Sequence, residues 1–191
     1  MASTSRYRRG LLGRLGLEFS CIAPGADETA QPGERPAALV ARLARAKAAA
    51  VARQHPHAWV IGSDQVAVLA EGSEESMLGK PGSAVRCIEQ LQRCSGREVA
   101  FLTAVAVMQQ DGNARFEFID TTRVMFRVLD PAAIQRYVDR ESPLDCAGGF
   151  KSEGLGIALC ESIDSADPTA LIGLPLIRLS AVLRGAGFEL P

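Results

Sequence analysis

Hydrophobic residues along the chain follow two different spacings, and each spacing predicts a different kind of element. Apolar side chains three and four residues apart share one face of a helix, and this pattern predicts five helices. The predicted helices begin near Arg6, Pro36, Ser83, Pro131 and Leu176. Continuous or alternating apolar runs predict strands over residues 17–22, over 59–61 continuing through 66–69, over 99–107 and over 116–128.

Two of the predicted strands form a hairpin. The segment Asp111-Gly112-Asn113 stands between the runs 99–107 and 116–128 and is typical of a turn that reverses the chain. Helices interleaved with strands, together with an antiparallel hairpin, predict an α/β fold with a mixed sheet flanked by helices. With 191 residues, the chain is predicted to form one domain over residues 1–191.

The composition argues against several classes of protein. The 21 basic and 22 acidic residues give a net charge of -1, and 5% of the residues are aromatic, which disfavours a nucleic-acid partner. Five cysteines without a CxxC pair and two histidines disfavour a disulfide framework and a zinc site. They favour reduced thiols in a cytoplasmic protein. No apolar run is long enough to span a bilayer, so a membrane partner is not expected either.

The first candidate for chemistry is an acid that follows an apolar run. Asp64 comes after Trp59-Val60-Ile61 and the small residues Gly62 and Ser63, which are expected to loosen the strand at its end. Sixteen residues later, Lys80 stands between a glycine and a proline. A carboxylate at a strand end and a lysine on a later loop suit a phosphate and a divalent cation. The alternative is that Asp64 forms a turn or caps a helix.

Further charged residues are candidates for the same ligand. Ser and Thr residues precede Arg8 and Arg9 at the start of the first helix, where backbone N–H groups attract anions; the alternative is a solvated face. Lys47 falls on the inward stripe of the second helix, where it either reaches out to solvent or serves a buried anion. Adjacent carboxylates stand at Asp27 and Glu28. The glycines of the segment 145–154 are expected to let a ligand approach the backbone closely.

Several short motifs stand in a fixed order along nearly the whole chain. They are Ala-Ser-x-Ser-x-x-Arg-Arg at 2–9, Asp-Glu at 27–28, Arg-Leu-Ala-x-x-Lys-Ala at 42–48, Ile-Gly-Ser-Asp-Gln at 61–65, Gly-Lys-Pro at 79–81, Ser-Gly at 95–96, Ala-Gly-Gly at 147–149 and Ile-Gly-Leu-Pro at 172–175. In these motifs and in their order, the chain resembles the Maf-like nucleoside triphosphate pyrophosphatases.

The resemblance implies a fold and a reaction. The fold is a mixed, twisted β-sheet flanked by helices, with two lobes around a central cleft. The family opens with a strand before its Ala-Ser motif, whereas this chain begins at Met1-Ala2. Either the start has been trimmed or misassigned, or that strand is missing. The reaction is hydrolysis of a nucleoside triphosphate to the monophosphate and diphosphate with Mg²⁺ or Mn²⁺.

The resemblance also implies roles for individual residues. Asp64 is the expected proton acceptor, with a role as metal ligand alone as the alternative. Lys80 and Arg8 are expected to assist the reaction, and Glu28 and Asp64 to hold the metal ion. The expected phosphate-binding residues are Ser3, Arg8, Arg9, Lys47 and Lys80.

Within the family, two sites in the sequence indicate which branch the chain resembles. Phe-Lys-Ser-Glu-Gly at 150–154 and an aromatic residue at Tyr7 are similar to the branch that acts on 7-methyl-GTP. The branch acting on dTTP and UTP usually has arginine at position 7 and glutamine at position 153. Tyr7 is expected to stack on the cationic base, Glu153 to accept hydrogen bonds from its N1–H and exocyclic amine, and Gln65 to set its orientation.

Two departures from the family pattern stand next to each other. Arg6 replaces a common proline, and Tyr7 stands where tryptophan is frequent. Because tyrosine keeps a flat π face, the base preference is expected to survive with some loss. Two other functions stay open, a dTTP/UTP pyrophosphatase and a non-catalytic nucleotide-binding regulator of septum formation. A homodimer is an open alternative to a monomer.

Overall fold

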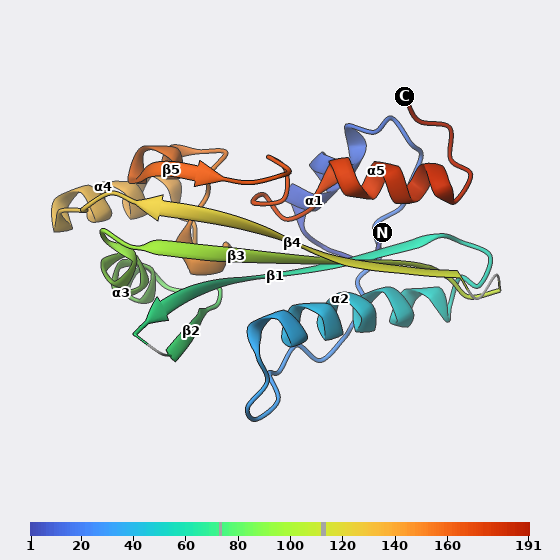
Figure 1. Ribbon diagram of the computed structural model, residues 1–191, viewed down its shortest axis with the longest axis horizontal. Coiled ribbons are helices and arrows are strands. Elements are labelled where there is room, and N and C mark those ends of the chain that lie inside the picture. Colours follow the sequence, from blue (N-terminus) through green and yellow to red (C-terminus); the bar gives the residue numbers. More distant parts are fainter. Residues whose placement is uncertain (73, 112–113) are drawn as a thin grey trace. The chain divides into compact units, whose positions relative to one another are not determined.

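The computed structural model describes residues 1–72, 74–111 and 114–191 and contains helices and strands in alternation (Figure 1). The helices are α1 (Arg6–Gly13), α2 (Pro36–Ala52), α3 (Ala84–Cys94), α4 (Pro131–Glu141) and α5 (Leu176–Gly185), with short 3-10 turns at Ala147–Gly149 and Leu155–Leu159. The strands are β1 (Val60–Glu71), β2 (Glu74–Leu78), β3 (Glu98–Gln109), β4 (Ala114–Phe126) and β5 (Cys160–Asp164). They form a sheet in the order β2-β1-β3-β4-β5.

The predicted α/β class and the five helices are confirmed. The β1–β2 and β4–β5 ladders are antiparallel, and Ala2 makes isolated parallel bridges to Ile22 and Gly62 outside these ladders. The strand predicted over 17–22 is wrong, because only Ile22 of that segment pairs, and it pairs with a single residue. The predicted turn at Asp111-Gly112-Asn113 lies partly outside the described residues, since Gly112 and Asn113 are not among them.

The chain divides into two compact units. The first contains Met1–Gln65, Thr103–Asp120 and Asp167–Pro191, and the second contains Val66–Leu102 and Thr121–Ala166. This division agrees with the expectation of two lobes. The single domain over residues 1–191 and the cleft implied by the resemblance stay predictions.

In the first unit, helices lie along both sides of the strands. Figure 1 shows α2 on one side of β1, β3 and β4, and α5 on the other. Pro36 begins α2 because its fixed φ suits the first turn of a helix, and Ser5 caps α1 by accepting from the Arg8 N–H. The core on the α5 side consists of apolar side chains, including Leu11, Leu12, Ile61, Val105, Phe118, Leu179 and Leu183. Burying each of these leucines stabilises the fold by about 1.5–3 kcal/mol.

The alternation of side chains along β1 assigns neighbouring residues to opposite faces. Ile61 joins the core on the α5 side. Gly62 faces α2, where a Cβ atom would lie 2.3 Å from the Ala44 carbonyl oxygen and 2.7 Å from the Ala48 nitrogen. The absence of a side chain at Gly62 therefore allows α2 to lie directly against β1. Its role is close packing within a strand, and the prediction that Gly62 loosens the end of a strand is wrong.

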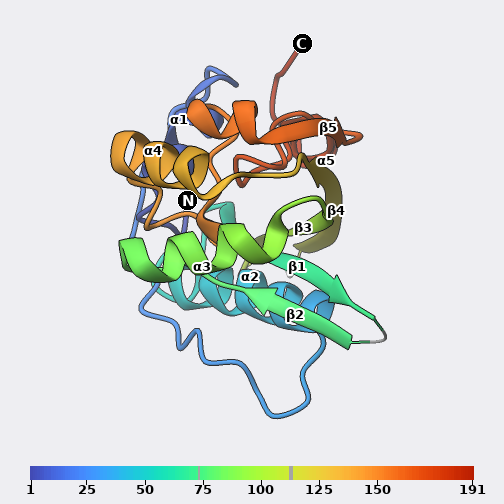
Figure 2. The same cartoon turned by 90° about the vertical axis from the view of Figure 1, so that its left-hand side faces the viewer.

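In the second unit, α3 and α4 lie side by side (Figure 2). Ser83 and Asp130 cap these helices by accepting backbone N–H groups of the first turns, as the sequence predicts for Ser83. In the segment 145–154, a Cβ atom at Gly148, Gly149 or Gly154 would meet protein atoms, so these glycines allow close packing. The expectation that they let a ligand approach the backbone stays a prediction. Gly149 has a φ of 63°, and a Cβ atom there would lie 2.5 Å from Cys87 Sγ.

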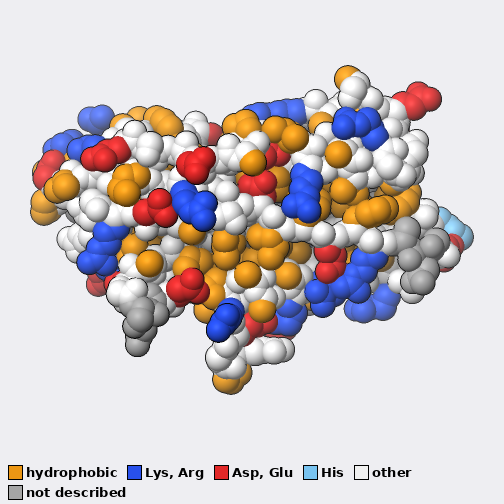
Figure 3. Space-filling model, in the orientation of Figure 1, with side chains coloured by type: hydrophobic (Ala, Val, Ile, Leu, Met, Phe, Trp, Pro, Cys, Tyr) orange, Lys and Arg blue, Asp and Glu red, His pale blue; other side chains and the backbone are white. Residues whose placement is uncertain are grey.

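The surface carries both signs of charge. On the face shown in Figure 3, Lys and Arg side chains are interspersed with Asp and Glu side chains, in keeping with the net charge of -1. Among the described residues, no helix combines the length and the apolar character that crossing a bilayer requires.

The close approach of α2 to β1 gives a prediction about stability. We expect Gly62→Ala to lower the free energy of unfolding by about 1–3 kcal/mol, because backbone atoms of α2 occupy the space of the new methyl group. Gly10→Ala is the matched control, since a Cβ atom at Gly10 of α1 would have no atom within 4 Å. The control should raise stability by up to about 1 kcal/mol, because alanine favours a helix interior. Urea denaturation of both variants measures this difference, and equal stability of Gly62→Ala and the wild type would contradict the packing argument.

Candidate functional site

Two neighbouring residues interrupt the buried run of β1. Every residue from Val60 to Leu69 is buried except Asp64 and Gln65, which are half-buried. Because neighbours on a strand face opposite ways, the two partly buried side chains lie on opposite faces of β1. Asp64 lies within β1, which continues to Glu71, so the expectation that it stands at a strand end is wrong.

On the α2 face, Asp64 belongs to a three-residue ion cluster. Lys47 Nζ donates to Asp64 Oδ1 at 2.6 Å and lies 2.7 Å from Glu28 Oε1. The lysine side chain is 6% exposed and that of Asp64 13%, whereas Glu28 is 54% exposed. Lys47 therefore does not reach out to solvent; it pairs with the largely buried Asp64 and with the exposed Glu28. An ammonium group stays buried only when such partners compensate its desolvation.

The loop that carries Glu28 is attached to α2 by Arg42. Arg42 donates to both carboxylate oxygens of Glu34 at 2.7 Å and to the Thr29 carbonyl at 3.0 Å. The Arg42 hydrogen bonds, with a smaller contribution from the Gln31 N–H, lower the pKa of Glu34 from 4.5 to about 2. Glu34 is therefore ionised at neutral pH, and the loop keeps its attachment there. Sequence reasoning missed this role, although Arg42 and Lys47 belong to one motif.

Arg8 is held at the other end of the site. Its Nε donates to the Gly173 carbonyl at 2.9 Å, which fixes the guanidinium and leaves its terminal nitrogens for other acceptors. Burial lowers the pKa of Arg8, and the charges of Asp64 and Glu28 partly offset this effect. Arg8, Asp64 and Glu28 are thus near enough to interact electrostatically. Ser3 is buried, and its Oγ accepts from the Ser5 N–H at 3.1 Å.

On the opposite face of β1, buried hydroxyl and amide groups hold the segment that leads into α5. Ser63 is fully buried and donates to the Gly173 carbonyl at 3.0 Å. Gln65 Nε2 donates to Thr103 Oγ1 at 2.8 Å and to the carbonyls of Ala170 and Leu171 at 3.1 and 3.0 Å. Thr103 in turn donates to the Ala170 carbonyl at 3.0 Å. The residues on both sides of Asp64 are therefore fixed, which limits the movement of Asp64 itself.

These partners were not predicted from the sequence. Ser63 and Thr103 are small polar residues within apolar strands, and their hydrogen bonds reach residues far along the chain. A fully buried hydroxyl group requires a partner, so such residues indicate that one exists but not which one.

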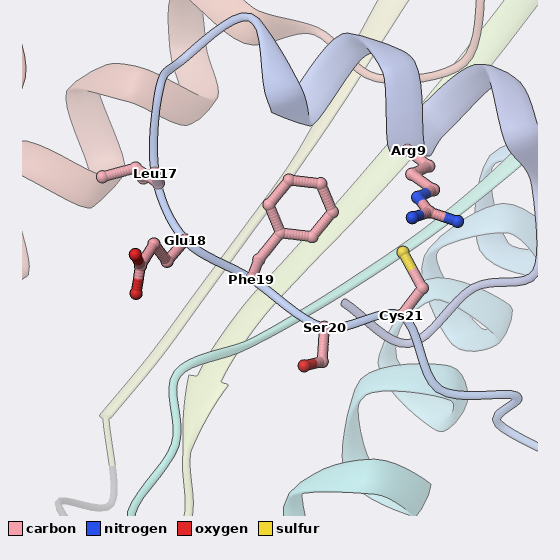
Figure 4. Close-up of a pocket in the computed structure, with 6 residues that line it drawn as sticks. All are labelled: Arg9, Leu17, Glu18, Phe19, Ser20 and Cys21. Carbon is pink, nitrogen blue, oxygen red and sulfur yellow. The ribbon is translucent and has the colours of Figure 1, made fainter.

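Two other predicted site residues, Arg9 and Tyr7, have neighbours outside the ion cluster. Arg9 lines an open hollow with the segment from Leu17 to Cys21, and Figure 4 shows its guanidinium directed toward Cys21. The Arg6 guanidinium lies over the Tyr7 ring, 4.8 Å from its centroid, and donates to the Tyr7 hydroxyl at 2.7 Å. One face of the Tyr7 ring thus already has a cation against it, and the predicted stacking of Tyr7 on the base stays a prediction.

Lys80 and Glu153 belong to the second unit, and both are exposed. Lys80 follows β2, and Glu153 follows the 3-10 turn Ala147–Gly149. Their predicted roles beside Asp64 and Tyr7 stay predictions.

The acidic residues of the first unit suit a hard divalent cation. Within the described part of the chain, no three residues of the His, Cys, Asp and Glu types gather into a metal cluster. Glu28 and Asp64 provide two carboxylates that converge on one point, the Lys47 ammonium. Mg²⁺ and Mn²⁺ prefer such oxygen ligands, and Mg²⁺ usually keeps several waters, so one or two carboxylates are sufficient for it. The donor set therefore fits the expected cation.

Comparisons with known proteins agree on one family. A family model described as Maf-like protein matches residues 1–186. A protein from Xanthomonas oryzae pv. oryzae (strain MAFF 311018) is 54% identical over 191 residues, covering 100% of this chain and 97% of the relative. Relatives from Polaromonas sp. (strain JS666 / ATCC BAA-500) and Alcanivorax borkumensis are 53% and 48% identical, with 100% of this chain and 85% and 95% of the relatives covered. All three relatives carry the name 7-methyl-GTP pyrophosphatase.

The hydrogen bonds of Thr103 give a testable prediction. Thr103→Val keeps the shape of the side chain but removes the hydroxyl group that Gln65 and Ala170 share, which should lower the free energy of unfolding by about 1–2 kcal/mol. It should also speed the hydrogen exchange of the Gln65 side-chain amide, measured by NMR. Thr103→Ser is the matched control, because it keeps the hydroxyl group and should keep the exchange slow. Equal exchange rates in the valine variant and the wild type would show that Thr103 does not hold this amide.

Proposed function

The chain belongs to the Maf-like protein family, and on that premise we propose that it is a nucleoside triphosphate pyrophosphatase acting on 7-methyl-GTP. Water adds across the bond between the α- and β-phosphates, giving 7-methyl-GMP and pyrophosphate. The names of relatives 48–54% identical to this chain support the substrate. The observation that carries the proposal is the half-buried Asp64 carboxylate, held by Lys47 within an otherwise buried strand.

The residues of the first unit suit the hydrolysis of a phosphoanhydride. A triphosphate requires neutralisation of its oxygens and a water molecule positioned in line with the leaving group. We assign Asp64 as the acceptor of the proton that the attacking water loses. Arg8 suits phosphate binding, because its Nε is fixed on the Gly173 carbonyl while its terminal nitrogens can contact two oxygens.

Other cations complete the proposed phosphate site. Lys47, Lys80 and Arg9 would contribute positive charge, and Ser3 a hydroxyl group. Lys47 requires a rearrangement for this role, whereas Ser3 can still donate its O–H to a phosphate oxygen. The Lys47 ammonium now contacts two carboxylates, and the Ser3 oxygen accepts from a backbone N–H.

Glu28 and Asp64 would hold a divalent cation, Mg²⁺ or Mn²⁺. When bound, such a cation neutralises charge on the phosphate oxygens and orients them. Arg42 contributes indirectly, because it attaches the loop of Glu28 to α2.

The proposed recognition of the base depends on three side chains. Methylation at N7 makes guanine cationic, so stacking on Tyr7 adds cation–π attraction of about 1 kcal/mol. Glu153 would accept from the N1–H and exocyclic amine of the base. Gln65 uses its Nε2 within the protein, so its Oε1 is the group that remains to accept from the base.

We also propose a cytoplasmic location, which the free state of all five cysteines supports. The homodimer stays an open alternative.

The role of Asp64 gives the first functional prediction. Asp64→Asn should lower kcat for 7-methyl-GTP by about 10²-fold or more, because an amide cannot accept the proton of the attacking water. Asp111→Asn is the matched control, since Asp111 is an exposed acid that pairs with His57. Its kcat should equal that of the wild type. Turnover of Asp64→Asn within a few-fold of the wild type would exclude Asp64 as the base.

The proposed base pocket gives the second functional prediction. The double variant Tyr7→Arg with Glu153→Gln should lower the ratio of kcat/KM for 7-methyl-GTP to that for UTP, because it removes the stacking ring and the charged acceptor. Tyr7→Phe is the control, because it keeps the ring and should change the ratio little. A ratio unchanged in the double variant would show that other residues select the base.

A further inference from the structure

The Lys47 ammonium occupies an unusual position for a phosphate-binding group. It is buried and contacts two carboxylates, at 2.6 Å in β1 and at 2.7 Å in the loop before α2. A lysine that awaited a phosphate would more readily be found pointing into solvent, since a solvated ammonium needs no compensation. Here the protein itself supplies two anions for one cation.

The two carboxylates need a cation between them. Two carboxylates that converge on one point repel each other, and the energy rises as solvent is excluded. The Asp64 side chain is 13% exposed, so water screens its side of the pair weakly. The Lys47 ammonium therefore stabilises a pair of acids that would otherwise separate.

The same pair is the donor set that the proposed function gives to a divalent cation. An ammonium group and a divalent cation cannot both lie within bonding distance of the same carboxylate oxygens without strong repulsion. We propose that Lys47 is a built-in counter-ion that competes with the divalent cation for Glu28 and Asp64. The inference rests on the metal-ligand part of the proposed function.

A consequence for substrate binding follows. A divalent cation that takes the carboxylates frees the ammonium, which is then available for the phosphate oxygens. Binding of the cation and binding of the triphosphate are thereby coupled through one side chain. This coupling reconciles the buried ion pair with the role of Lys47 as a phosphate-binding residue.

The experiment measures Mn²⁺ binding in the absence of nucleotide. Lys47→Met and Lys47→Gln both remove the competing charge, and the glutamine keeps a hydrogen-bond donor in case the methionine variant does not fold. We expect either variant to bind Mn²⁺ about ten-fold more tightly than the wild type, as measured by electron paramagnetic resonance of free Mn²⁺. The matched control is Lys151→Met, which removes a lysine from its ion pair with Glu141 in the second unit. Its Mn²⁺ affinity should equal that of the wild type.

A second measurement needs no substitution. Titration of the wild type with Mg²⁺ should shift the ¹⁵Nζ resonance of Lys47, because the ammonium loses its carboxylate partners. Mn²⁺ affinity in the Lys47 variants that is equal to or weaker than in the wild type, or an unchanged Lys47 resonance, would overturn the inference.

Failure of this inference can be distinguished from failure of the proposed function. The Lys47 variants could bind Mn²⁺ more tightly while the wild type does not release pyrophosphate from 7-methyl-GTP. That result would support the counter-ion role and exclude the proposed reaction. If the wild type hydrolyses 7-methyl-GTP and the variants bind Mn²⁺ no more tightly than the wild type does, the reaction is supported and the counter-ion role is excluded.

Discussion

The contact between a buried lysine and an acid in the central strand is the interaction on which the rest of the site depends. Lys47 reaches Asp64 because α2 lies directly against β1, and α2 can lie there because Gly62 has no side chain. Burying an ammonium group costs several kcal/mol, and the two carboxylates compensate that cost. The packing of helix on strand and the placement of charge are therefore one arrangement. A change to either would disturb the other.

The two faces of β1 carry different kinds of polar interaction. The face with Asp64 carries the ion cluster, and the face with Ser63 and Gln65 carries neutral hydrogen bonds to the segment before α5. Arg8 interacts with both faces. It donates to the Gly173 carbonyl, and the lowering of its pKa by burial is opposed by the charges of Asp64 and Glu28. A carboxylate that must act on a substrate benefits from neighbours that are held in place, since small displacements of reacting groups are costly.

How far the sequence predicts this arrangement depends on the range of each interaction. Helix periodicity is local, so it places Lys47 on the inward stripe of α2, but it leaves open which anion lies opposite. The anion is Asp64, and it lies opposite Lys47 because of how α2 packs on β1. The sequence does not specify that register. The strand predicted over 17–22 failed because its hydrogen-bonding partner is the single residue Ala2, and β5 was missed because most of its residues are exposed. The glycines of 145–154 were assigned to a ligand, whereas Gly149 is required by contact with Cys87, a residue far away in the sequence.

The most direct test of the account is a pyrophosphate-release assay on the purified chain with a panel of ordinary and modified triphosphates, in Mg²⁺ and in Mn²⁺. A pyrophosphatase selective for 7-methyl-GTP gives pyrophosphate as the product and has its highest kcat/KM for that triphosphate. Release of orthophosphate, or no hydrolysis of any triphosphate with either metal ion, would contradict the proposed function.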